Sequence, residues 1–300
     1  MQVGRHPPLW GVVGTVLMVA GFFLVALLTT VLLTRGEGVA EGDARVAVVT
    51  IAGVISNDVT ERTVRQLTKY GDDASIKAVV LRIDSPGGGV AASQEIYQEV
   101  RRVRLGGKPV VASLGGVAAS GGYYIACVAD RIFANAGTVT GSIGVVVQLA
   151  SVEQLLHKVG VESTVITSGP FKDSGNPTRT LRPEERQVFQ ALVDDVYQQF
   201  VEAVAQGRNL PMDEVRQAAD GRIFTGRQAK DLQLVDEIGS LHDAVSYAAS
   251  TSGIVGKPKL VQERKERFWW LRSLFESLSA SLVWTPFSNA QAVLQYRWLY

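Results

Sequence analysis

The sequence predicts an α/β domain with a mostly parallel sheet flanked by helices, preceded by one N-terminal transmembrane helix. From about residue 45 onward, short apolar runs rich in β-branched residues alternate with helical segments. These runs are apolar at nearly every position, which is typical of parallel strands covered on both faces. Residues 9–33 carry no charged side chain, which is typical of a membrane span.

The composition is that of a folded protein, with 46% hydrophobic and 20% charged residues in a chain of 300. Lys and Arg number 30 against 29 for Asp and Glu, a net charge of +1, so we expect no nucleic-acid partner. A single cysteine excludes an intramolecular disulfide and a cysteine-based zinc site. Because His6, His157 and His242 are widely separated, we expect no metal site and no cofactor.

The membrane span is predicted over Leu9–Leu33, after a short tail of residues 1–8. At about 1.5 Å per residue the run reaches roughly 37 Å, more than the roughly 30 Å of a hydrocarbon core. The alternative is a cleaved signal peptide, whose apolar region would span only about 7–15 residues, so we predict an uncleaved anchor. The flanking Arg5 and Arg35 scarcely decide its orientation. Residues 34–44 are predicted to form a polar linker.

Residues 45–262 are predicted to form the folded domain, with strands and helices in alternation. We expect strands at Val46–Ile51, Ala78–Ile83, Pro109–Leu114, Arg131–Ala134, Ile143–Val147 and Ser163–Thr167. We expect helices at Thr60–Tyr70, Ser93–Val103, Gly121–Ala129, Val152–Lys158, Pro211–Ala219, Gly226–Leu232 and His242–Ala249.

The longest helix is predicted over Arg182–Gln206. Pro183 suits its first turn, and the acidic residues that follow suit the positive end of the helix dipole. An apolar stripe at helical spacing predicts one buried face. It is formed by Val188, Leu192, Val196, Phe200 and Val204.

A distinct tail, residues 263–300, follows the domain. It begins with charged residues and then contains Trp269, Trp270, Trp284 and Trp298. Its apolar side chains recur at helical spacing, so it could lie in a membrane interface, pack on another subunit, or form an ordinary C-terminal helix. The sequence leaves these alternatives open.

Two glycine-rich segments each follow a predicted buried strand. Asp84–Gly89 (DSPGGG) lets the backbone turn sharply and approach a bound group, although a tight βα turn would need similar residues. It matches neither the P-loop nor the dinucleotide-binding pattern. In Gly115–Tyr124, Ser120 lies among small residues at a loop–helix junction, as a nucleophile requires. A helix N-cap serine is the structural alternative.

A serine nucleophile needs a base, and none of the histidines is well placed for the task. Lysine can serve when burial disfavours its ammonium form, so a Ser–Lys dyad is the chemistry that these residues permit. Lys172 lies in the loop Ser168–Asp173, and a hydroxyl in Thr138–Val145 could orient such an amine or simply satisfy a turn. Spacing alone does not single out Lys172.

Taken together, these segments resemble the signal peptide peptidase A family in its short, membrane-anchored form. The resemblance spans about residues 45–240. It is carried by DSPGGG, by the block from Ala119 to Asp130, by TGSIGV, by SGPFKD and by Gly221–Gly239. Each block is weak alone, but the five in this order are specific. The resemblance implies a ClpP/crotonase-like fold and a serine endopeptidase with an acyl-enzyme intermediate.

The resemblance also implies a role for each matching residue. Ser120 would be the nucleophile, Lys172 the general base and Ser142 the hydroxyl that orients the lysine. The oxyanion hole would be formed by backbone N–H groups of the glycine turn and of the residue after the nucleophile. The candidates are Gly87 or Gly88 from the turn, together with Gly121.

Members of this family form dome-like homo-oligomeric rings on the membrane, with sites shared between neighbours. The resemblance therefore implies membrane lipid and other copies of this chain as partners. It implies peptide substrates, namely cleaved signal peptides and other hydrophobic or unfolded segments. It also places the chain in the bacterial inner membrane, with the N-terminus inside and the catalytic domain extracytoplasmic.

Asn176–Pro177 departs from the family, in which Ser-Pro often follows the lysine; the retained Pro177 keeps the stiff turn. Cys127 is expected to be a small buried helix residue rather than a rival nucleophile.

Three other functions remain open from the sequence. They are a related Ser–Lys membrane protease that cleaves one specific membrane-protein partner, a crotonase-like acyl-CoA enzyme, and an inactive scaffold for membrane partners.

Overall fold

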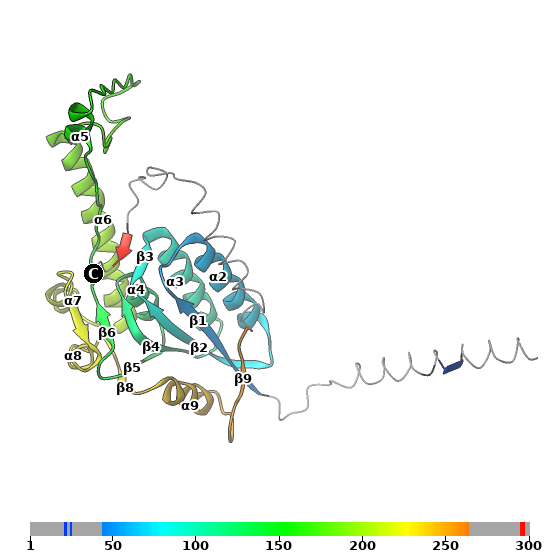
Figure 1. Ribbon diagram of the computed structural model, residues 1–300. Helices are drawn as coiled ribbons and strands as arrows, with labels where there is room; N and C mark the ends of the chain where they lie inside the picture. Colours follow the sequence, from blue (N-terminus) through cyan, green and yellow to red (C-terminus); the bar gives the residue numbers. More distant parts are fainter. Residues whose placement is uncertain (1–20, 23–24, 26–43, 264–294, 298–300) are drawn as a thin grey trace, which may run out of the picture. The chain divides into compact units, whose positions relative to one another are not determined.

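The computed structural model describes residues 21–22, 25, 44–263 and 295–297 (Figure 1). The chain divides into two compact units, Met1–Asp43 and Ala44–Tyr300. Of the predicted span Leu9–Leu33, only Gly21, Phe22 and Val25 are described, and all three are helical. Among the described residues, no helix has the length and apolar character needed to cross a membrane. The Trp-rich tail lies almost wholly outside the described residues.

The second unit is built on one eight-stranded sheet. Its strand order is β7-β6-β4-β2-β1-β9, with β5 paired to β4 and β8 paired to β5. Every strand pair in it is parallel except β6–β7. The strands are β1 (Arg45–Ala52), β2 (Ile76–Ser85), β4 (Val110–Ala119), β5 (Arg131–Ala134), β6 (Val139–Gly141), β7 (Ile223–Thr225), β8 (Glu237–Ile238) and β9 (Lys259–Val261).

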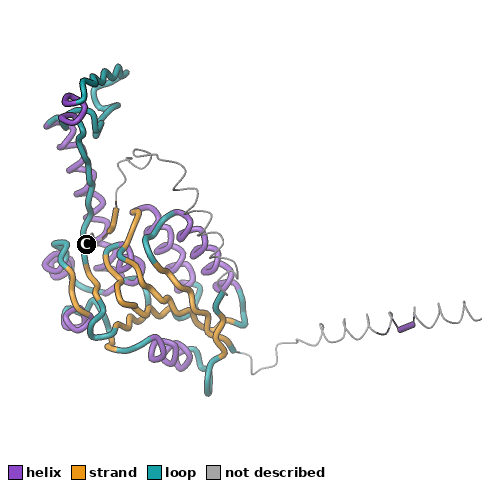
Figure 2. Tube along the Cα trace, viewed as in Figure 1, coloured by secondary structure: helices purple, strands orange, loops and turns teal. Residues whose placement is uncertain are grey.

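Helices cover both faces of this sheet, as the continuous apolar runs predicted (Figure 2). One face packs against α2 (Asn57–Asp72), α3 (Val90–Leu105) and α4 (Gly121–Ala126). The other face packs against α9 (Leu241–Thr251). Along β1, alternate residues enter the two cores, since Val46 and Val48 lie on the α9 side and Ala47 and Val49 on the other. The α/β architecture with a mostly parallel, helix-covered sheet is therefore confirmed.

Strand β4 changes partner midway, and this change positions its C-terminal end. Its first half pairs with β5 and its second half pairs with β6. Between the halves the register against β2 shifts, so that Gly115–Val117 bulge opposite Asp84. The Asp84 carboxylate accepts a hydrogen bond from the Val117 N–H at 3.0 Å. A Cβ on Gly115 would lie 2.8 Å from the Asp84 carboxyl carbon, so the bulge needs glycine there.

The long helix α6 (Pro183–Arg208) forms as predicted, but only its second half is buried in the core. Val196, Phe200 and Val204 are buried, as the apolar stripe predicted. Val188 and Leu192 are exposed instead, by 48% and 42%. The prediction of one continuous buried stripe is therefore wrong for the first half, because that half extends beyond the sheet and its helices (Figure 1).

Residues 142–182 form an arm along this first half of α6. It contains the short helix α5 (Glu153–Lys158) and long loops. The strands predicted at Ile143–Val147 and Ser163–Thr167 are wrong, since neither segment is a strand in this chain. Both runs have the composition of a strand, but neither lies in the sheet. The short strand β6 lies earlier, at Val139–Gly141.

The remaining elements complete the unit beside the sheet. Helices α7 (Met212–Ala218) and α8 (Gly226–Asp231) form close to their predicted positions. A separate two-stranded sheet pairs β3 (Gly87–Gly89) with β10 (Gln295–Arg297).

Candidate active site

Ser120 lies where β4 ends and α4 begins, as the sequence predicted. Its backbone has φ 54° and ψ −117°, which an L-residue rarely adopts. Two hydrogen bonds hold it there: its N–H donates to the Gly141 carbonyl at 2.8 Å, and its carbonyl accepts from the Tyr124 N–H at 2.8 Å. Within the described part of the chain, its hydroxyl makes no hydrogen bond, so the Oγ is not committed to capping α4. The serine is held in a strained backbone with its hydroxyl unengaged.

Strand β3 passes beside the start of α4 and is formed by the glycine turn. Gly87 has φ 101°, and its N–H donates to the Ser85 hydroxyl at 3.1 Å. Ile55 binds one edge of this strand, donating to the Gly87 carbonyl at 2.9 Å and accepting from the Gly89 N–H at 3.0 Å. Because N–H and C=O groups alternate in direction along a strand, those of Gly88 face the opposite edge.

Two glycines allow this close approach. A Cβ on Gly88 would lie 2.2 Å from the Ile55 carbonyl oxygen, so no larger residue fits. A Cβ on Gly122 would lie 3.0 Å from the Ser85 carbonyl oxygen. The N–H of Gly121 belongs to the first turn of α4, where backbone donors have no partner within the helix. The N–H of Gly88 thus faces the edge of β3 that pairs with β10, and that of Gly121 lies in the first turn of the helix that follows Ser120, whereas the N–H of Gly87 is engaged within the turn itself.

The hydroxyls of the TGSIGV region have different environments. Thr138 and Thr140 donate to the carbonyls of Gly115 and Ala118, at 2.8 and 2.7 Å, and so brace the second half of β4. Ser142 has φ 50° and lines a cavity of about 550 Å³ together with Tyr197. No hydrogen bond of its hydroxyl is found among the described residues. Of these hydroxyls, only that of Ser142 is open to a further group.

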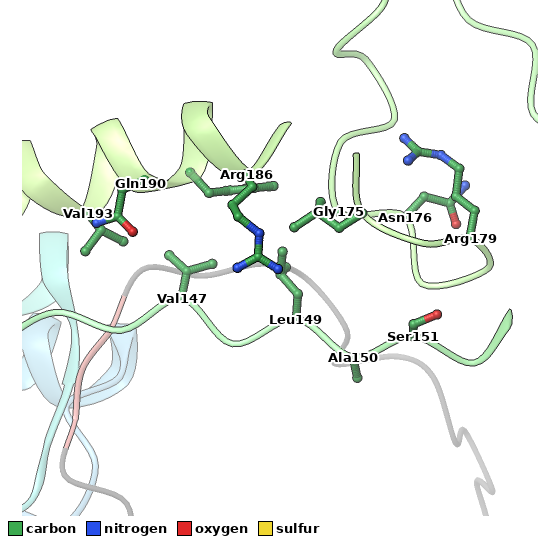
Figure 3. Close-up of a pocket in the computed structure, with 12 residues that line it drawn as sticks. Val147, Leu149, Ala150, Ser151, Gly175, Asn176, Arg179, Arg186, Gln190 and Val193 are labelled. Carbon is green, nitrogen blue, oxygen red and sulfur yellow. The ribbon is translucent and has the colours of Figure 1, made fainter. Parts of the chain in front are cut away.

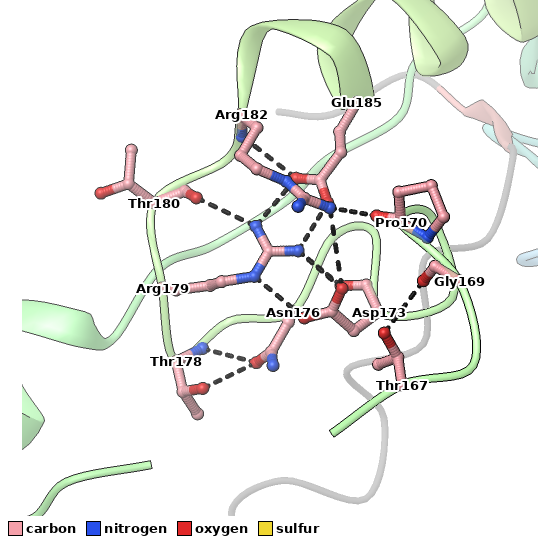
Figure 4. A network of polar contacts seen from close by, with 10 residues as sticks. All are labelled: Thr167, Gly169, Pro170, Asp173, Asn176, Thr178, Arg179, Thr180, Arg182 and Glu185. Carbon is pink, nitrogen blue, oxygen red and sulfur yellow. Dashed lines mark hydrogen bonds and ion pairs between the residues drawn. The ribbon is translucent and has the colours of Figure 1, made fainter. Parts of the chain in front are cut away.

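Lys172 is exposed on the arm, and a polar network anchors its loop to the start of α6 (Figure 4). Arg179 donates to Glu185 at 2.5 Å and to Asp173 at 2.9 Å. Arg182 donates to Glu185 at 2.5 Å and also to the Pro170 carbonyl. The Glu185 side chain is 0% exposed. Hydrogen bonds, first from Arg179 and then from Arg182, hold the pKa of its carboxyl well below its usual range, so it stays ionised.

The anchor of this loop is far from Ser120 within one chain. Phe200 of α6 contacts Tyr124 of α4, with ring centroids 5.1 Å apart, which fixes the level of the nucleophile's helix along α6. Glu185 precedes Phe200 by fifteen positions, which at about 1.5 Å per residue corresponds to roughly 22 Å along the helix axis. Figure 1 shows α5, at the far end of the arm, well apart from α4 beside the sheet. One chain does not bring Ser120 and Lys172 together.

The arm also encloses a cavity of about 330 Å³ that is remote from Ser120 (Figure 3). It lies between residues 147–151 and the first half of α6, with Arg186 and Gln190 among its lining residues. Exposed apolar side chains surround this region of the chain. They are Leu155, Val159, Val161, Val165, Ile166, Phe171, Val188 and Leu192.

Two features of the site were not predicted from the sequence. The anchoring network was missed, because Glu185 was interpreted only as a charge suited to the helix dipole. Its spacing from Arg182, one helical turn away, was the available signal. The role of Ile55 was also missed, since nothing in its local sequence indicates pairing with a glycine turn. No cluster of His, Cys, Asp or Glu among the described residues could hold a metal ion.

Comparison with known proteins places the chain in a family. The pattern of peptidase family S49 matches residues 103–254, and that of Clp protease matches residues 43–139. A protein named as a protease in Synechocystis sp. is 47% identical over 210 residues, covering 70% of this chain and 75% of that protein.

Two further relatives are longer. A protein that carries the name signal peptide peptidase SppA in Enterococcus faecium is 42% identical over 180 residues, 60% of this chain and 52% of that protein. Protease 4 of Salmonella typhi is 40% identical over 197 residues, 66% of this chain and 31% of that protein. The S49 match covers half of the chain and contains both Ser120 and Lys172. The predicted resemblance is therefore confirmed, and the chain belongs to peptidase family S49.

Proposed function

We propose that this protein is a membrane-bound serine endopeptidase that uses Ser120 as nucleophile and Lys172 as general base. The observation that carries the proposal is the environment of Ser120. Among the described residues its hydroxyl has no hydrogen-bond partner, its backbone is strained, and the residue after it begins α4, which packs against the glycine strand β3. A nucleophile beside preorganised N–H donors is the arrangement that acyl transfer requires.

The oxyanion hole is assigned to the N–H groups of Gly88 and Gly121. Between the two candidates in the glycine turn, Gly88 is favoured because the Gly87 N–H already donates to Ser85. The edge of β3 that carries the N–H and carbonyl of Gly88 already accepts β10 as an antiparallel strand, which supports the addition of an extended peptide there. Such a peptide would have its backbone held by β3 while one carbonyl lies against the two N–H groups.

The reaction then follows from these positions. The neutral amine of Lys172 takes the Ser120 proton as Oγ bonds to the peptide carbonyl carbon, and the N–H groups stabilise the resulting oxyanion. The tetrahedral intermediate collapses, the C–N bond breaks, and Lys172 returns the proton to the leaving amine. Water then attacks the ester and gives its proton to Lys172. The ester bond then breaks and Lys172 returns the proton to Oγ, which restores the Ser120 hydroxyl and the neutral amine and releases the new carboxyl end.

We place the dyad between two copies of the chain, in a homo-oligomeric ring. Three observations support this arrangement. The anchor of the Lys172 loop is roughly 22 Å along α6 from the level of Ser120. The arm exposes apolar side chains such as Ile166, which is 95% exposed. The cavity beside Ser142 has room for a group from outside the chain. Ser142 would then orient the incoming amine.

Cleaved signal peptides and other hydrophobic or unfolded segments are the proposed substrates. The name signal peptide peptidase, which the Enterococcus relative carries, supports this substrate class. The uncharged run at residues 9–33 supports an uncleaved anchor in the bacterial inner membrane, with the N-terminus inside and the catalytic domain outside the cytoplasm. Membrane lipid would then surround the anchor and the hydrophobic segments that the enzyme cleaves.

The direct test is hydrolysis of a fluorogenic apolar peptide and of casein by the purified full-length chain. Ser120→Ala and Lys172→Ala should each abolish turnover without loss of folding. Lys158→Ala, on the same arm, should remain as active as the wild type. Activity that survives Lys172→Ala would refute the base assignment, and an inert but assembled wild type would refute the peptidase.

Co-expression tests the sharing of sites between copies. Chains with Ser120→Ala and chains with Lys172→Ala are each inactive alone. If each site takes its serine from one copy and its lysine from the next, random co-assembly restores about a quarter of wild-type activity. If the dyad lies within one chain, the mixture stays inactive.

A further inference from the structure

The N-terminal edge of the main sheet is where the chain from the predicted anchor enters the domain. β1 begins at Arg45, and the predicted linker of residues 34–44 can reach at most about 40 Å from the end of the span. In the parallel sheet, Arg45 lies opposite Lys259, the first residue of β9, and opposite Ile76, the first residue of β2. The segments that lead into β9 and β2 therefore lie at this same edge.

The loop between α9 and β9 projects from this edge (Figure 1). Ile254 fixes the loop, since its N–H donates to the Ala249 carbonyl at 3.0 Å and its side chain packs against the core between α9 and the sheet. The next residue, Val255, is 98% exposed. A Cβ on either neighbouring glycine, Gly253 or Gly256, would meet nothing within 4 Å. The loop thus holds an apolar side chain at an open tip.

Basic side chains share this edge with the tip. Lys257 follows Val255 in the loop, Lys259 begins β9, and Lys77 is the second residue of β2. All three lysines are exposed. Among the described residues, neither Lys77 nor Lys257 has a hydrogen bond or an ion pair. Their ammonium groups are therefore available to a negatively charged partner.

The acidic side chains near these strand ends are engaged within the chain. Asp72, at the end of α2, lies 3.4 Å from Arg102. Asp130, just before β5, binds Arg104 at 2.5 Å. Asp73 accepts hydrogen bonds at 2.8 Å from the N–H and the hydroxyl of the serine two positions on. Among the described residues around the starts of β1, β2 and β9, the unpaired charge is therefore positive.

We propose that the loop Ser252–Pro258 is a contact with the membrane surface, in which Val255 enters the headgroup region while Lys257 and Lys77 bind anionic lipid headgroups. The proposal rests on the proposed function, because the anchor is what brings this edge to the bilayer. An exposed apolar side chain beside lysines suits a lipid interface, where the apolar part leaves water and the ammonium groups meet phosphates. Such a contact would hold Ser120, at the far end of the ten-residue strand β4, roughly 33 Å from the loop.

Quenching by labelled lipids tests the contact in the full-length chain, reconstituted in vesicles. Val255→Cys carries a fluorescent label at the tip. Val54→Cys is the matched control, since Val54 is also exposed, by 42%, but follows the opposite end of β1. Val25→Cys places the same label in the predicted anchor. Cys127 is buried and stays unlabelled in the folded protein, and Ser120→Ala is present throughout, so that no chain is cleaved.

The vesicles contain zwitterionic lipid alone or with anionic phosphatidylglycerol, and a nitroxide quencher lies just below the headgroups. In the anionic vesicles we expect the label at Val255 to be quenched and the label at Val54 to stay bright. Adding Lys257→Gln should lower the ratio of lipid-contacting to detached labels about fivefold, the effect of one charge near an anionic surface. Lys158→Gln, on the arm, should leave that ratio unchanged.

The label at Val25 separates failure of the contact from failure of the anchor. Quenching at Val25 without quenching at Val255 would overturn the contact and leave the anchor in place. Quenching at Val54 that equals or exceeds that at Val255 would overturn it too, because this edge would then not face the bilayer. Quenching at Val255 that ignores both anionic lipid and Lys257→Gln would overturn the role of the lysines. If Val25 escapes quenching, the proposed anchor fails, and the label at Val255 still decides whether this loop meets lipid.

Discussion

Backbone strain at Ser120 can be measured by exchanging alanine for glycine at two neighbouring positions. In an inactive chain with Ser120→Ala, the Cβ is still present in a backbone with φ 54° and ψ −117°. In Ser120→Gly the same backbone is unstrained, because glycine has no Cβ. Ala119 supplies the control. It is the preceding residue, it is fully buried, and it lies in β4 paired with Gly141 of β6.

The expected difference follows from what each exchange removes. At Ala119, loss of a buried methyl group costs about 0.8 kcal/mol, and the greater freedom of the unfolded chain costs about 0.4–1 kcal/mol more. The exchange at position 120 has the same two costs, but it also releases about 1–3 kcal/mol of strain. The change from alanine to glycine should therefore be about 1–3 kcal/mol more favourable at position 120 than at position 119.

The assay compares three full-length proteins: Ser120→Ala, Ser120→Gly, and Ser120→Ala combined with Ala119→Gly. Their free energies of unfolding are measured by denaturant titration in detergent, with near-ultraviolet circular dichroism as the signal. For a domain of this size, each kcal/mol also moves the thermal midpoint by about 2–4 °C. If glycine costs the same at both positions, Ser120 stores no strain and the geometric argument for a preorganised nucleophile fails.

Three further predictions concern other parts of the domain. Burial raises the pKa of the Cys127 thiol to about 12, so at pH 8 only about one thiol in ten thousand is ionised. A disulfide reagent should therefore label Cys127 only after unfolding, and rapid labelling of the folded protein would contradict its burial. Glu185→Gln weakens the anchor of the Lys172 loop and should lower kcat about a hundredfold in a folded protein. The control Glu184→Gln, at an exposed position, should leave kcat unchanged. Equal rates for the two variants would show that the network does not position Lys172. Gly88→Ala places a Cβ 2.2 Å from the Ile55 carbonyl oxygen and should lower kcat at least about a hundredfold. Gly89→Ala, whose Cβ would have its nearest neighbour at 3.4 Å, should lower kcat far less. Similar rates for the two variants would contradict the assignment of the Gly88 N–H to the oxyanion hole.

The sheet was predictable where strands are buried on both faces. β1, β2 and β5 lie at their predicted positions. A short run that is apolar at every position is stable as a strand only where helices cover both faces of the sheet. β4 was predicted only as far as Leu114, whereas it continues to Ala119. Its second half contains Gly115 and Gly116, which local propensity disfavours in strands. Pairing with β6 and the bond to Asp84 outweigh that preference.

The errors on the arm have a different cause. Ile143–Val147 and Ser163–Thr167 have the residues of strands, and Val188 and Leu192 have the spacing of a buried helix face. A local apolar pattern indicates that a segment can be buried, but not whether a strand buries it, as the fully buried Ile143 outside the sheet shows, nor which chain buries it. A sequence therefore predicts apolar faces equally well for a core and for contact with another copy. The positions of Ser120 and Lys172 came from motif order, which contains no information about their separation along α6.

The proposed sharing of the dyad makes activity depend on assembly. The loop of Lys172 is anchored at Glu185, roughly 22 Å along α6 from the level at which Phe200 contacts the helix that follows Ser120. If another copy must supply the lysine, the active species is an oligomer, and its population falls as the protein is diluted. Activity per chain should therefore fall on dilution. Activity per chain that stayed the same at every dilution down to the monomer would show that one chain completes its own dyad.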